Sequence, residues 1–241
     1  MNTIEVQQLP AGRGAEWLSQ GWGLFKQAPG IWIGLIVIWM LLAIASDFVP
    51  VAGALALNLV APALTAGLCI GCRSLEDGQG LRIGHLFAAF QTDRIGPLII
   101  VGALGLAGVV VLVLVAMLLG MGFALGGGMH DMEGMDGMGP GMLLAGLLVL
   151  ALAVPLAMAL WFAPPLVALD GIAPVDSLRL SFQACLRNFV PLLVWGLLAF
   201  VLLDVAAIPL LLGWLIAVPL LAAAYYRMYR EIFAARTAPL P

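Results

Sequence analysis

The sequence predicts an all-α integral membrane protein with six transmembrane helices, arranged as three pseudo-repeated hairpins that each follow a short interfacial amphipathic helix. Of its 241 residues, 63% are hydrophobic and only 10% are charged, whereas a soluble domain carries about a quarter charged residues. The apolar residues form runs of about 20, the length that crosses a bilayer. Prolines and charged clusters separate these runs, and the basic residues gather in alternate connections.

The first unit comprises a cytoplasmic N-terminus with an interfacial helix over residues 1–29 and a transmembrane hairpin over residues 30–72. Its spans are predicted at 30–48 and 54–72. The segment Val49-Pro50-Val51-Ala52-Gly53 ends the first span, because proline and glycine interrupt helices.

The second unit begins with a cytoplasmic interfacial helix within residues 73–96, followed by a hairpin over 97–169. Its spans are predicted at 97–123 and 142–169, joined by a Met-rich periplasmic loop at 124–141. Pro155, Pro164 and Pro165 are expected to kink or shorten the second of these spans.

The third unit has an interfacial helix within residues 170–189, a hairpin over 190–232 and a cytoplasmic tail over 233–241. The apolar run 190–226 contains a single charge, Asp204, and is too long for one span. A turn is therefore predicted at 208–213, where Pro209 and Gly213 repeat the proline–glycine corner that follows the first span.

The basic residues give the predicted topology. All ten fall on one side of the six-span arrangement, and five acidic residues fall on the other. Because basic residues concentrate in cytoplasmic connections, the sequence predicts a bacterial inner-membrane protein with both termini in the cytoplasm. The basic residues are Arg13, Lys26, Arg73, Arg82, Arg94, Arg179, Arg187, Arg227, Arg230 and Arg236.

The three segments before the odd-numbered spans are amphipathic and too short to cross, as is typical of helices that lie in the membrane interface. Their predicted apolar stripes are Trp17, Gly21, Leu24 and Phe25 in the first, Ile83, Leu86, Phe87 and Phe90 in the second, and Leu178, Phe182, Cys185, Leu186 and Phe189 in the third. The even-numbered spans each hold a proline in a similar setting, at Pro62, Pro164 and Pro219. Parallel repeats occur in some transporters, but duplication without transport explains the same pattern.

The most unusual segment is the predicted outer loop, where four methionines recur every third residue beside one histidine. Thioether sulfur is a soft ligand that selects Cu(I), and the M-x-x-M spacing is similar to the methionine motifs of copper-handling proteins. A flexible low-complexity loop is the competing interpretation. The candidate metal ligands are Met129, His130, Met132, Met135 and Met138.

Other candidate groups are few. Cys69 and Cys72 form a C-x-x-C at the end of the second span, which suits a soft metal or a dithiol, or two small apolar residues. Within the spans, Asn58 is expected to bond a neighbouring helix, and Asp47 and Asp204 to lie at solvated outer ends. No catalytic or cofactor-binding residues are predicted.

Several motifs carry a resemblance. In four motifs the chain resembles an uncharacterised family of proteobacterial multi-pass inner-membrane proteins. The motifs are Trp17-Leu18-x-x-Gly21-Trp22-x-Leu24-Phe25, the run Phe162–Leu169, Ser177-x3-Ser181-Phe182-x3-Leu186-Arg187-Asn188-x-x-Pro191 and Tyr225-Tyr226-x-x-Tyr229-Arg230-Glu231-Ile232-Phe233. The resemblance implies an inner-membrane location and names no active residues. A fainter similarity links the chain to the membrane domain of glycerophosphodiester phosphodiesterases, without a catalytic domain.

Two function classes follow. The first is a non-enzymatic accessory, assembly or envelope-organising factor whose partners are the lipid bilayer, other membrane proteins or a second copy of the chain. The alternative is a small transporter or copper-handling protein that uses the Met-rich loop. The net charge of −3 argues against a nucleic-acid partner, which would select a basic surface.

Overall fold

The computed structural model describes residues 5–49, 51–125, 140–208 and 212–233, and these residues are helical or connecting segments. In chain order the helices are α1 (Arg13–Phe25), α2 (Pro29–Asp47), α3 (Ala52–Glu76), the 3-10 helix η1 (Ile83–Gln91), α4 (Ile95–Leu125), α5 (Pro140–Trp161), α6 (Ala163–Asp170), α7 (Pro174–Arg187), α8 (Phe189–Ala207) and α9 (Trp214–Ile232). The predicted all-α class is confirmed.

Five segments of the described residues are long and apolar enough to cross a membrane. They are Pro29–Asp47, Ala52–Glu76, Ile95–Gly120, Leu143–Asp170 and Phe189–Ala207, and they correspond to the first five predicted spans. The helix at the place of the sixth, α9, carries Arg227, Arg230 and Glu231 in its last turns, so its apolar part is short.

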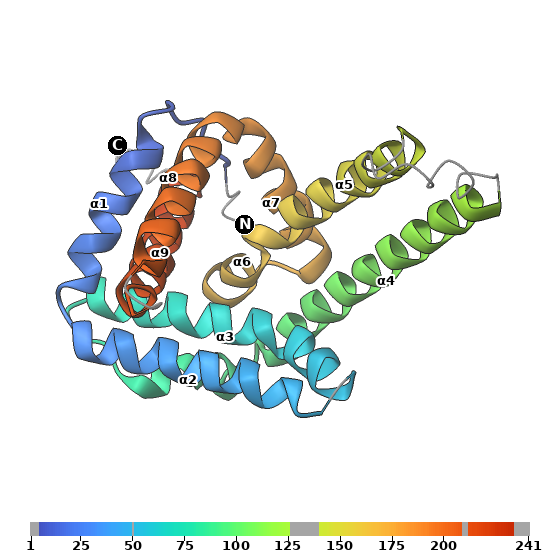
Figure 1. Ribbon diagram of the computed structural model, residues 1–241. Coiled ribbons are helices and arrows are strands. Elements are labelled where there is room, and N and C mark those ends of the chain that lie inside the picture. The colour runs from blue at the N-terminus through green and yellow to red at the C-terminus, as the bar shows by residue number, and fades with distance from the viewer. Residues whose placement is uncertain (1–4, 50, 126–139, 209–211, 234–241) are drawn as a thin grey trace.

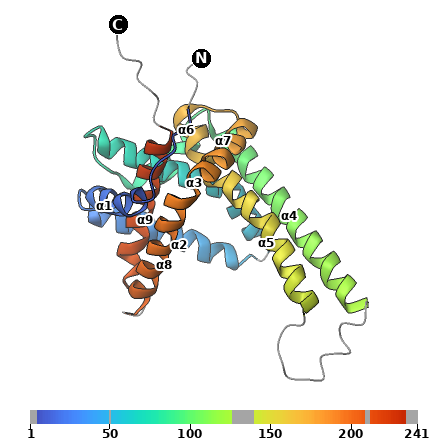
Figure 2. The ribbon, with the colours of Figure 1, turned by 90° about the horizontal axis from the view of Figure 1, so that it is seen from above.

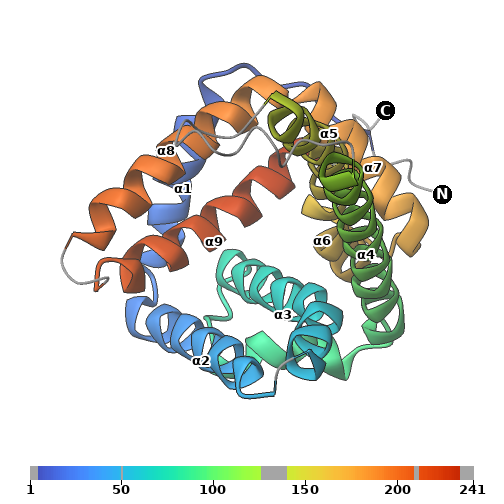
Figure 3. The same ribbon diagram turned by 45° about the vertical axis from the view of Figure 1, so that its right-hand side comes forward.

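The helices form three hairpins that diverge from one end of the molecule. In Figures 1 and 3, α2–α3, α4–α5 and α8–α9 run along different sides, and α4–α5 reaches away from the others. The second helix of each hairpin packs on a short helix: α3 on η1, α5 on α7, and α9 back on α1. This cyclic order joins the end of the chain to its beginning.

Close backbone approach makes two of these contacts possible. A Cβ on Gly21 of α1 would lie 2.7 Å from the backbone nitrogen of Ala224 in α9. A Cβ on Gly67 of α3 would collide with the carbonyl oxygen of Leu86 in η1. Only glycine lets the paired backbones come this near.

The main core lies where the short helices meet the hairpin ends, which we call the junction end (Figure 2). The buried residues there include Trp17 and Leu24 of α1 and Tyr226, Met228 and Ile232 of α9. By contrast, large apolar side chains such as Leu118 of α4, Leu147 of α5 and Phe200 of α8 are more than half exposed, as helix faces that meet lipid are.

The amphipathic helices differ in part from the sequence prediction. The stripe Trp17, Gly21, Leu24 and Phe25 of α1 is buried as expected. In η1, Leu86 and Ala89 are buried while Ile83, Phe87 and Phe90 are exposed. Three residues per turn in a 3-10 helix align Leu86 with Ala89 and Phe87 with Phe90 on separate lines, and Ile83, the first residue of η1, is exposed although it aligns with Leu86.

In α7 the buried face is made of Ser177, Ser181, Ala184 and Cys185 rather than the large apolar residues. The predicted stripe had included Leu186, which is exposed. The small side chains let α7 approach α5, so the tertiary contact determines which face is buried.

Candidate functional site

The predicted copper ligands Met129, His130, Met132, Met135 and Met138 lie outside the described residues. Cys69, Cys72 and Cys185 are free and buried. Within the part of the chain that the structure describes, no group of three or more His, Cys, Asp or Glu side chains is placed to hold a metal ion. The metal prediction for the loop therefore stays a prediction.

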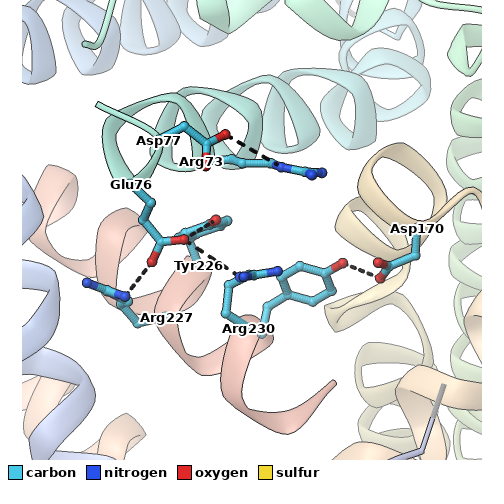
Figure 4. A network of polar contacts seen from close by, with 8 residues as sticks. Arg73, Glu76, Asp77, Asp170, Tyr226, Arg227 and Arg230 are labelled. Carbon is cyan, nitrogen blue, oxygen red and sulfur yellow. Dashed lines mark hydrogen bonds and ion pairs between the residues drawn. The ribbon is translucent and has the colours of Figure 1, made fainter. Parts of the chain in front are cut away.

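A network of polar side chains occupies the junction end, around Glu76 at the end of α3 (Figure 4). The Tyr226 hydroxyl donates a hydrogen bond of 2.7 Å to Glu76 Oε2, and Arg227 forms an ion pair with the same carboxylate. Arg230 lies 3.6 Å from Glu76 through Nε. One acidic residue of α3 thus binds three residues on two successive turns of α9.

Two further acidic residues fix α9 on its other sides. The Tyr229 hydroxyl donates to Asp170 at the end of α6. Glu231 of α9 accepts a hydrogen bond of 2.7 Å from the Trp17 indole and lies 2.6 Å from Arg13 Nε of α1. Partly exposed ion pairs contribute about 0–1 kcal/mol each, so the network positions α9 more than it stabilises the fold.

The N-terminal segment crosses the junction end as an extended strap. The Gln7 amide donates to the Ile232 carbonyl at 2.9 Å. Asn188, which is fully buried between α7 and α8, accepts from the Leu9 amide at 2.9 Å and donates to the Gln7 carbonyl at 2.8 Å. The side-chain amide nitrogen of Asn188 also donates to the Ala184 carbonyl, so both polar atoms of this side chain have hydrogen-bond partners.

The break between α5 and α6 is built from three residues. In an unbroken helix the Phe162 amide would donate to the Met158 carbonyl. Here Ser181 of α7 is inserted between them: its hydroxyl accepts from Phe162 at 2.9 Å and donates to Met158 at 2.7 Å. A side chain in the helical hydrogen-bond ladder bends the helix, in addition to the predicted effect of the prolines.

Pro165 has no amide hydrogen, so it leaves the Trp161 carbonyl without its helical donor. The Tyr225 hydroxyl of α9 donates to that carbonyl. Tyr225 also stacks on Phe162 and meets Trp161 edge to face. The break in hairpin two is therefore sealed by residues of α7 and α9.

A cavity of about 540 Å³ lies between the hairpins, with walls from α3, α4, α5, α8 and α9. We call it the central cavity. Its lining is mainly apolar and includes the polar groups of Asn58, Thr65, Trp195 and Tyr225. Asn58 bonds the Ala54 carbonyl of its own helix at 3.0 Å, which differs from the predicted bond to a neighbouring helix because this turn of α3 faces the cavity.

A second cavity of about 290 Å³, the side cavity, lies between α5 and α8. It shares Ala157, Trp161 and Trp195 with the central cavity. Trp161 and Trp195 meet edge to face, with ring centroids 6.0 Å apart. Cavities of this size and composition bind apolar or amphiphilic molecules.

A probable inner membrane protein of Burkholderia thailandensis is 32% identical to this chain over 213 residues, which cover 84% of the chain and 76% of the relative. The chain belongs to this family of inner membrane proteins. No protein-family model and no solved structure matches the sequence, and the fainter similarity to glycerophosphodiester phosphodiesterases finds no support. With its five membrane-length helices, the chain is a multi-pass inner membrane protein.

Sequence reasoning missed most of the residues that build the junction end. Glu76, Asp170, Ser181 and Asn188 were not singled out as contact residues. For Glu76, Asp170 and Asn188 the signal that could have found them is position: each is polar and lies at the end of, or next to, a long apolar segment, where an unpaired buried group is costly. Ser181 lies in the middle of α7 and has no such signal. Ser181 and Asn188 were noticed only as members of a family motif.

Proposed function

We propose that the chain crosses the membrane six times, with both termini in the cytoplasm. The position of α9 supports the sixth crossing. Trp214 at its start donates to the Leu203 carbonyl near the end of α8, and the Ile232 carbonyl at its end accepts from the amide of Gln7, which precedes α1. A helix that starts at the far end of α8 and ends beside the N-terminal strap runs back across the bilayer.

Introduced cysteines test this topology, because the three native thiols are buried. In a variant without native cysteines, a membrane-impermeant maleimide should label Phe48→Cys and Ile208→Cys in intact spheroplasts. It should label Gln79→Cys only after lysis. Labelling of Gln79→Cys in intact spheroplasts, or its absence at Ile208→Cys, would overturn the arrangement.

We also propose that the three units descend from a repeat of one short helix and one hairpin. The cyclic packing of η1, α7 and α1 on α3, α5 and α9 supports this. So do Pro62 in α3 and Pro219 in α9, whose predicted counterpart Pro164 lies at the start of α6, directly after α5.

For function, we propose a non-enzymatic accessory or assembly factor that acts through helix contacts in the membrane. The observation that carries this proposal is that the hairpins are joined at the junction end while their remaining length diverges. The buried polar groups Ser177, Ser181 and Asn188 all bond backbone atoms. These polar groups thus form hydrogen bonds within the chain itself, and the surface available to partners consists of apolar helix faces.

Site-specific photo-crosslinking in living cells tests this function. A photoreactive residue at Leu118 of α4 or Leu197 of α8, both exposed, should give a discrete adduct with another membrane protein or a second copy of the chain. Leu98 is fully buried and serves as the matched control. Adducts confined to lipid at both exposed positions would contradict the proposal.

The second candidate is a small transporter, favoured by the central cavity with walls from all three hairpins. In its copper form it needs the Met-rich loop. Titration with Cu(I) or Ag(I) should then show binding tighter than micromolar, lost when Met129, Met132, Met135 and Met138 become Leu. Absent or unchanged binding would exclude a receptor role for the loop.

A further inference from the structure

We propose that the central cavity is a binding site for one acyl chain of a membrane phospholipid, which enters from the bilayer through the side cavity between α5 and α8. This goes beyond a role in helix contacts. It assigns a ligand class to the central cavity and a route by which that ligand arrives.

The dimensions of the central cavity fit one acyl chain. Its wall on α3 runs from Asn58 to Leu68, and ten helical steps of about 1.5 Å make this wall about 15 Å long. The hydrocarbon core of a bilayer is about 30 Å thick, so the wall matches the depth of one leaflet. One phospholipid acyl chain spans one leaflet, so its length matches the length of this wall.

The chemistry of the lining fits an acyl ester. Leu68, Val101 and Leu160 supply apolar surface, and a hydrocarbon chain fits such a surface. Trp195 lines both cavities, and its indole N–H is buried with no hydrogen-bond partner among the described residues. A buried donor without an acceptor is costly. A carbonyl oxygen of a bound phospholipid is an acceptor for such a donor.

The route follows from how the hairpins meet. Hairpins one and two are closed by the packing of α3 on α4, and hairpins one and three by α2 on α9. Within the described residues, no comparable packing joins α5 to α8, and the side cavity occupies their seam. Val154, Phe189 and Leu193, at its outer side, are more than 40% exposed, so the side cavity continues into the lipid-facing surface.

The charge at the mouth fits a phospholipid headgroup. The junction-end border of the side cavity is formed by Cys185 and Phe189. Between them in sequence lies Arg187, which is exposed, and one of its guanidinium nitrogens donates to the Val6 carbonyl of the strap at 3.3 Å. Basic side chains at the membrane surface attract anionic headgroups. A lipid whose chain lies between α5 and α8 would therefore place its phosphate near Arg187.

Photolabelling tests the proposal with the purified full-length protein in vesicles of phosphatidylethanolamine and phosphatidylglycerol. The probe is a phosphatidylglycerol with a diazirine in the middle of one acyl chain. Peptide mapping should show adducts on cavity residues, including Thr65 and Trp195, above the level on residues 143–150, the lipid-facing part of α5. Equal labelling of both regions means annular lipid only and would overturn the proposal.

A matched pair of substitutions tests the route. A Cβ on Gly196, at the side cavity, meets nothing within 4 Å, and the same holds for Gly146 on the exposed face of α5. Gly196→Phe should block the seam and lower labelling of Thr65 several-fold, whereas Gly146→Phe should leave it unchanged. Should Gly196→Phe fail to fold, as judged by gel filtration, Ala157→Phe narrows the seam from α5. Unchanged labelling of Thr65 in a folded seam variant would refute entry between α5 and α8.

Discussion

Ser181 illustrates how one side chain shapes this protein. It replaces a helical hydrogen bond between Phe162 and Met158 with two bonds of its own, and it is fully buried. The prolines at positions 164 and 165 predicted a disturbance in this span. The location of the helix break, and the hydrogen bonds by which Ser181 and Tyr225 satisfy its free backbone groups, depend on helices that are distant in sequence.

Ser181→Ala is expected to lower the free energy of unfolding by about 1–3 kcal/mol, because the Phe162 amide loses its acceptor in a buried position. Titration with sodium dodecyl sulfate in mixed micelles, followed by circular dichroism, measures this change. Ser177→Ala is the control: Ser177 is equally buried but bonds only Pro174 of its own helix. Equal losses in the two variants would show that Ser181 has no special part in the break.

Asn188 has the corresponding role at the strap. Asn188→Ala removes the bonds to Gln7 and Leu9 and should release the N-terminal segment. Because neutral hydrogen bonds contribute about 0.5–1.5 kcal/mol each, limited proteolysis before α1 should become markedly faster while the helical content stays the same. An unchanged cleavage rate would mean that the packing of Val6 and Leu9 holds the strap without Asn188.

At the scale of elements, the contacts between short helices and hairpins depend on small residues. Gly21 and Gly67 bring α1 to α9 and η1 to α3, and Ser181 and Ala184 bring α7 to α5. The size of the residue at the contact matters more here than its hydrophobicity, which explains why the predicted apolar stripe of α7 faces partly outward.

Gly21→Ala and Gly23→Ala should therefore change stability in opposite directions. The new Cβ at position 21 meets the α9 backbone, and overpacking costs about 1–3 kcal/mol. At position 23 the Cβ meets nothing within 4 Å, and alanine gains about 0.5–1 kcal/mol of helix propensity over glycine. Thermal unfolding in detergent distinguishes them; a more stable Gly21→Ala protein would argue against close packing of α1 on α9.

At the scale of the whole molecule, the C-terminal part of α9 is the centre of the junction end. It is bound by Glu76 of α3, Asp170 of α6, and Arg13 and Trp17 of α1. All three hairpins thus depend on the last helix of the chain. Assembly can be completed only after α9 has been synthesised and packed on α1.

The buried thiols report on the integrity of this core. Cys69, Cys72 and Cys185 should react slowly with maleimide in the folded protein at pH 7.5 and quickly once dodecyl sulfate unfolds it. Burial raises the pKa of Cys185 to about 12, so its thiolate fraction, and with it the labelling rate, should still rise with pH above 9. A plateau near pH 9 would indicate a solvated thiol and an open junction end.

Part of the site could be predicted and part could not. The stripe of Trp17, Gly21, Leu24 and Phe25 was predicted because helical periodicity alone groups it. Glu76 with Arg227, and Asp170 with Tyr229, could not be paired, because each pair joins helices far apart in sequence. The cavities likewise lie where the hairpins diverge, and no local sequence pattern predicts where that happens.

The sequence by itself determined that the chain lies in lipid, which segments are helical, and approximately where the helices end. Apolar runs without charge require lipid, and prolines and charged clusters interrupt those runs, so these properties are local. Only the tertiary structure decided that α9 returns to α1, that Ser181 fills the break in hairpin two, and that the seam between α5 and α8 adjoins a cavity. These features arise from contacts between distant segments, where shape and unpaired backbone groups, rather than hydrophobicity, select the partner.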